Sequence, residues 1–147
     1  MPTPGECEGL GVTQIGGKVK AALELLDSRL DQIDLVYGGA IIHFSHAYIH
    51  KSAGTPGKDP GTGWSQEAQL VLASVSGSRV LPVLPNTISD GYLEVGGIRH
   101  ELIPLPFGRR GEATLSLVFV DGSQFEISGE RPVIELSGTA KFLENVP

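Results

Sequence analysis

Glycine-containing dipeptides divide this chain into short apolar stretches, and they constrain its fold more than any other feature. Gly38-Gly39, Gly96-Gly97 and Asp121-Gly122 each lie between segments rich in β-branched, aromatic and other apolar residues that alternate with polar ones. Glycine readily adopts the positive φ angles that two-residue hairpin turns require. The sequence therefore predicts three antiparallel β-hairpins.

Further strands bring the expected number to about nine. Residues 69–75, 79–84, 133–137 and 141–143 carry strand-forming patterns bounded by turn residues. Prolines such as Pro104 and Pro106 lack the N–H group that a central strand donates, so we expect their segments at sheet edges. Many short strands separated by Gly and Pro are typical of an antiparallel meander that forms a sandwich or a barrel. We therefore expect a mainly β fold.

The segment before the first hairpin carries a different period. Its apolar residues recur at intervals of three or four, which is the spacing of one helix face: Val19, Ala22, Leu23, Leu26, Leu30 and Ile33. This pattern predicts one N-terminal amphipathic helix over residues 17–30. Residues 1–13, rich in Pro, Gly and Glu, are expected to be a mobile tail, with a single β-rich domain over 14–147.

The composition limits which binding partners and which cellular compartment we expect for this protein. Eleven basic against seventeen acidic residues give a formal charge of −6, which disfavours nucleic acid and anionic membranes as partners. The single cysteine, Cys7, allows no intramolecular disulfide. We find no basic and apolar leader and no apolar stretch long enough to span a membrane as a helix. The expectation is a cytoplasmic protein without a cofactor.

Three histidines close together form the first candidate site. If Gly38-Gly39 is a two-residue turn, Asp34 lies opposite His43, and Asp31 lies opposite His46. His46 and His50 then share one face of the strand. An aspartate can orient an imidazole for base catalysis or metal binding, but opposite charges across a hairpin are also ordinary sheet stabilisation. We favour the structural interpretation and assign no metal site.

A long loop precedes the only tryptophan. Residues 52–63 are rich in Gly and Pro and predict a flexible loop that Trp64 closes. We favour Trp64 as an anchor in the core, and the alternative is a residue that stacks on a ligand.

No catalytic motif stands out, so the first hypothesis is a non-catalytic binding or interaction module. Its partner would be another protein or a second copy of the chain. The apolar stretch over 103–107 supports this hypothesis because it looks hard to bury. The alternative is a small-ligand site, or a metal- or histidine-dependent enzyme site, in a barrel mouth. Its candidate ligand-binding residues are Asp31, His46, Tyr48, His50 and Trp64.

Overall fold

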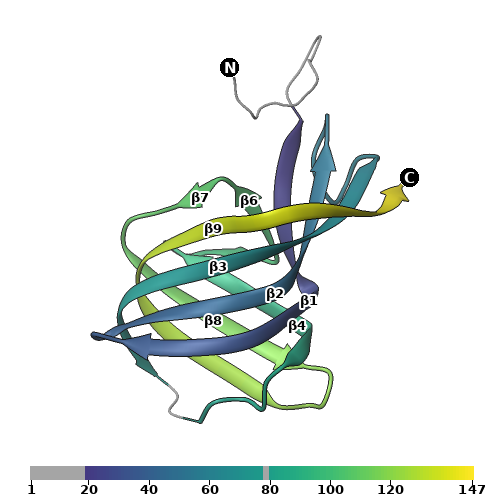
Figure 1. The fold of residues 1–147 in the computed structure, drawn as a ribbon. Coiled ribbons are helices and arrows are strands. Elements are labelled where there is room, and N and C mark those ends of the chain that lie inside the picture. The colour runs from purple at the N-terminus through teal and green to yellow at the C-terminus, as the bar shows by residue number, and fades with distance from the viewer. Residues whose placement is uncertain (1–18, 78–79) are drawn as a thin grey trace.

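The computed structural model describes residues 19–77 and 80–147, which form one antiparallel sheet of nine strands (Figure 1). In chain order the strands are β1 (Lys20–Val36), β2 (Gly39–Ser52), β3 (Gly61–Gly77), β4 (Asn86–Val95), β5 (Ile98–His100), β6 (Leu102–Leu105), β7 (Phe107–Gly108), β8 (Glu112–Phe119) and β9 (Gln124–Val146). The mainly β fold is therefore confirmed. The predicted tail over residues 1–13 lies outside the described part.

The strand pairings close into a ring. The sheet runs β5-β4-β8-β9-β3-β2-β1-β6, and β1 also pairs with β4 through Arg29 opposite Thr87 and Leu30 opposite Asn86. This short contact makes the sheet ring-like without forming a barrel. No helix that could span a membrane occurs in residues 19–77 and 80–147.

The predicted N-terminal helix is wrong, because the described part of that segment is strand β1. The register of β1 against β2 shifts between Glu24 and Arg29 and again around Asp31, which has no partner in β2. Such shifts add residues to one strand, three of them in β1 between Glu24 and Arg29, and they change which positions face inward. Buried positions follow one another at steps of two and three: Leu23, Leu25, Ser28, Leu30 and Ile33.

Bulges at a similar level in neighbouring strands create an arm. The register of β2 against β3 shifts between Phe44 and Ala47, and that of β3 against β9 shifts between Ser65 and Glu67. We call the part beyond these bulges the arm, which comprises residues 20–26, 46–52, 61–66 and 139–146. In Figure 1 the first part of β1 and the adjoining ends of β2 and β3 rise above the ring.

The inside of the ring holds one hydrophobic core. Its largest fully buried side chains include Phe119, Phe125, Leu23, Leu25, Leu30, Ile42, Ile49, Leu70, Leu72, Ile88, Leu93 and Ile103. In the apolar stretch over 103–107, Ile103 and Phe107 are buried and Leu105 packs partly buried against the core, whereas Pro104 and Pro106 are exposed.

The glycine-containing turns are where hairpins were expected. Gly96 and Gly97 both have positive φ and join β4 to β5, with Glu94 opposite Arg99. Asp121 and Gly122 lie in the connection between β8 and β9. The first turn is shifted, because Tyr37 and Gly38 take the positive φ angles and Val36 pairs with Gly39. Residues 80–84 belong to a segment that was predicted to be a strand, but they do not form one.

Candidate functional site

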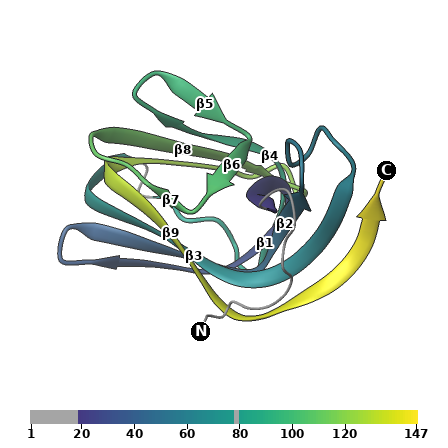
Figure 2. The same cartoon turned by 90° about the horizontal axis from the view of Figure 1, so that it is seen from above.

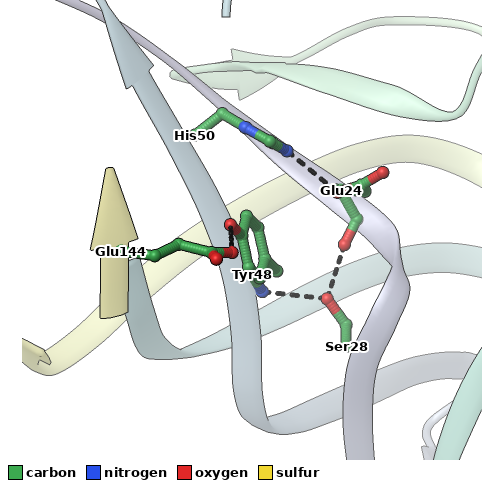
Figure 3. Close-up of polar contacts among 5 residues, drawn as sticks. All are labelled: Glu24, Ser28, Tyr48, His50 and Glu144. Carbon is green, nitrogen blue, oxygen red and sulfur yellow. Dashed lines mark hydrogen bonds and ion pairs between the residues drawn. The ribbon is translucent and has the colours of Figure 1, made fainter. Parts of the chain in front are cut away.

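Five polar side chains from β1, β2 and β9 gather on the arm and at the β1 bulge at its base (Figure 3). We call Glu24, Ser28, Tyr48, His50 and Glu144 the arm cluster. Sequence reasoning found Tyr48 and His50. It missed Glu24 and Ser28, which fell in the predicted helix, and Glu144, which lies 96 residues after Tyr48.

Ser28 supplies hydrogen bonds to backbone groups at the bulge in β1. Its hydroxyl donates to the carbonyl oxygen of Glu24 at 2.6 Å and accepts from the backbone N–H of Tyr48 at 2.9 Å. Ser28 is fully buried, and both bonds replace ladder contacts that the bulge interrupts. Its hydroxyl is therefore occupied structurally rather than free as a nucleophile.

His50 and Glu24 form a partly buried edge of the cluster. The Nε2 of His50 lies 2.8 Å from the Oε1 of Glu24, and the two side chains are 11% and 27% exposed. The imidazole also lies against Tyr48, with ring centroids 4.8 Å apart and an interplanar angle of 53°. Because the carboxylate can only accept, the histidine donates this hydrogen bond.

Tyr48 reaches across β3 to β9 because residue 63 is a glycine. The Tyr48 hydroxyl donates to the Glu144 carboxylate, although Gly63 of β3 lies between them in the sheet. A Cβ at position 63 would lie 2.1 Å from that hydroxyl oxygen, so any side chain there would block the path. Burial, followed by the Glu144 carboxylate, raises the pKa of Tyr48 well above its ordinary value of 10. The phenol therefore remains a hydrogen-bond donor at neutral pH.

Three of the five candidate residues lie outside this cluster. Asp31 is exposed at a bulge, and His46 is exposed opposite Arg29, so the predicted Asp31–His46 pair does not form. Trp64 packs partly buried against the core, its Nε1 donating to Thr62 at 2.8 Å. This environment agrees with the anchor that we favoured.

The other predicted aspartate–histidine contact does form. The Nε2 of His43 lies 3.0 Å from the Oδ2 of Asp34, although the backbone places His43 opposite Gln32. Hydrogen bonds from Gln32 and then His43 lower the pKa of the Asp34 carboxyl. Both side chains are partly exposed, which suits an ordinary contact between strands.

The side chains of the arm cluster already have hydrogen-bond partners within the protein. Glu24 and Glu144 accept from His50 and Tyr48, and Ser28 bonds two backbone groups. Within residues 19–77 and 80–147, no group of three or more His, Cys, Asp or Glu side chains could hold a metal ion. The cluster links β1 to β2 and β2 to β9 by hydrogen bonds.

Comparisons with protein-family models, with curated proteins and with solved structures found no match to this chain.

Proposed function

We propose that this chain is a non-catalytic interaction module that associates with a second copy of itself through the last part of β9. The observation that carries the proposal is a strand that is both exposed and paired on one side. Up to Ile134, β9 pairs with β3 on one side and with β8 or β7 on the other. Beyond Ile134, its partner among the described residues is β3 alone. We call residues 136–146 the β9 edge.

Exposed apolar side chains make the β9 edge a suitable surface for association. Leu136, Phe142 and Leu143 are 42%, 52% and 51% exposed. Figure 2 shows this part of β9 curving along the outside of β3 to the C-terminus. A strand edge offers unpaired N–H and C=O groups, and another strand can satisfy them by extending the sheet.

The edge at β6 is less suited to this role. Strand β6 pairs with β1 and has four residues, one of which is Pro104. Pro106 follows directly after it. Prolines remove donors that an added strand would need, and natural proteins use them to protect edges. Strand β5, at the other end of the sheet order, has only three residues. The β9 edge contains no proline up to Val146 and is longer than both, so we prefer it.

The order of side chains in the β9 edge favours a second copy as the partner. The sequence Lys141-Phe142-Leu143-Glu144 is complementary to itself when two copies run antiparallel. Glu144 pairs with Gly63 and Phe142 pairs with Trp64, so Leu143 is an extra residue in β9, and Lys141 and Glu144 lie on the same face. Lys141 of one copy can therefore lie opposite Glu144 of the other, with Phe142 and Leu143 of both copies between the two pairs. A two-fold axis repeats each contact, as expected for a symmetric dimer. Glu144 already accepts from Tyr48, and its carboxylate has further lone pairs for a lysine.

Charge-reversal variants test this pairing. In Lys141→Glu or Glu144→Lys alone, both cross-strand pairs become like-charged, and we expect dimerisation about ten-fold weaker at low salt. Mixing the two variants restores two opposite-charge pairs, so a heterodimer should form. Arg110→Glu is the matched control, because Arg110 is an exposed cation outside the β9 edge.

Sedimentation velocity of each variant and of their mixture gives the result. Association that is weaker in both single variants and recovered in the mixture supports the proposal. Equal association of Lys141→Glu and Arg110→Glu would contradict it. We further propose that the module works in the cytoplasm, which the single cysteine supports.

A further inference from the structure

A hollow separate from the β9 edge lies between the start of β1, the loop over residues 53–60 and strand β6. Its volume is about 430 Å³, within the range of small-ligand sites. Its walls are largely apolar and include Ala21, Ala22, Pro56, Leu102 and Leu105. An apolar hollow of this size suits an apolar group larger than a single methyl.

The loop wall is held in place by its own hydrogen bonds. The backbone N–H of Thr55 donates to the Asp59 carboxylate at 2.6 Å, and the N–H of Asp59 donates back to the Thr55 carbonyl at 2.8 Å. At the loop tip, a Cβ on Gly57 would lie 2.6 Å from a methyl group of Leu102. The loop predicted to be flexible therefore packs closely on β6, and the hollow is preformed.

Two lysines belong to the lining of the hollow. Lys20 and Lys58 are both exposed residues of its lining, and neither forms an ion pair with another residue in the described ranges. This concentration of positive charge is notable in a chain with a formal charge of −6. Two lysines without an ion-pair partner among the described residues, beside apolar walls, complement a ligand with an anionic head and an apolar body.

His100 adds a polar group to the lining. Its ring packs edge-on against Phe107, with centroids 5.6 Å apart. Burial and the nearby Arg109 guanidinium lower the pKa of His100, so the imidazole is neutral at pH 7. It can therefore hydrogen-bond a bound oxygen without adding charge.

We propose that this hollow binds a small amphiphilic monocarboxylate, with the carboxylate at Lys20 and Lys58 and the apolar body against Ala22, Leu102 and Leu105.

Decanoate is a suitable probe, and 1-decanol is its uncharged control. Both are titrated below their aggregation limits into the ¹⁵N-labelled full chain. We expect decanoate to shift amide signals around the hollow. The variant Lys20→Glu/Lys58→Glu should bind decanoate at least about ten-fold more weakly while its weak binding of 1-decanol is unchanged. Arg110→Glu/Arg131→Glu, at exposed positions outside the lining of the hollow, is the control with the same change in net charge.

Several outcomes would overturn this inference. These are decanoate shifts away from the hollow, equal affinity for decanoate and 1-decanol, and equal loss in the two double variants. Shifts at the hollow that appear on raising the protein concentration alone would show that a second copy fills it, and would also overturn the inference.

Discussion

Gly63→Ala tests how Tyr48 crosses β3 to reach Glu144. An added Cβ would lie 2.1 Å from the Tyr48 hydroxyl oxygen and 2.7 Å from its Cζ. Contacts this short force the ring to move. The hydrogen bond to Glu144 and the packing of the ring against His50 are then lost.

The expected loss follows from three contributions. Crowding in a packed site costs about 1–3 kcal/mol. The lost hydrogen bond costs about 1 kcal/mol, because Glu144 is exposed and regains water. Alanine is favoured over glycine in a strand by about 0.5–1 kcal/mol, which offsets part of the loss. We expect the free energy of unfolding to fall by about 2 kcal/mol and Tm by about 4–8 °C.

Urea unfolding at pH 7, followed by fluorescence of the single tryptophan, Trp64, measures the change. The decisive comparison repeats Gly63→Ala in a Tyr48→Ala background, where the substitution should be neutral or slightly stabilising because nothing occupies the space. Gly108→Ala is the matched control, since the nearest atom to its Cβ would lie 3.9 Å away. Equal losses in both backgrounds would refute this account of Tyr48.

Three other predictions concern the arm and the first hairpin. Ser28→Ala leaves the Tyr48 N–H unsatisfied at the bulge and should lower the free energy of unfolding by about 1–3 kcal/mol, measured by urea unfolding. The raised pKa of Tyr48 stabilises the fold fully below about pH 10, and this contribution is lost as the pH rises through the folded pKa. Tyr48→Phe should therefore show a smaller loss of stability above pH 10, and equal pH profiles would contradict this. The Asp34 carboxyl should titrate below its ordinary value of 3.8 by NMR, and His43→Ala should move that pKa upward.

The N-terminal helix could not be distinguished from a strand because bulges imitate helical spacing. Leu23, Leu30 and Ile33 are buried and stand at intervals that fit a helix face. The intervening bulges allow a strand to bury the same residues, because the extra residues in β1 interrupt its period of two. Bulges have no strong local signature, so composition and spacing alone favoured the helix.

The hairpins were predictable because their turns depend on local backbone conformation. Gly96 and Gly97 supply two positive φ angles in adjacent positions, and no distant contact is needed to place that turn. At the first hairpin, Tyr37 adopts a φ of 49°, which is uncommon for a residue with a side chain. The turn moved by one residue, so the register moved by two. Side-chain faces were preserved while backbone partners changed.

Only part of the arm cluster could be predicted from the sequence. Tyr48 and His50 share a face of one strand, so strand alternation brought them together. Glu24 was missed because it lies in the segment predicted as a helix, and Glu144 was missed because β9 pairs with β3, a strand distant from it in the sequence. Gly63 carried a usable signal, because glycine within a strand often marks a close approach of another group.

Hydrogen exchange measured across a range of protein concentrations tests the central claim, self-association through the β9 edge, most directly. The account predicts that amides of residues 136–146 become more protected as concentration rises, while those of β6 do not change. Exchange at the β9 edge that is independent of concentration, or protection that develops elsewhere, would contradict it.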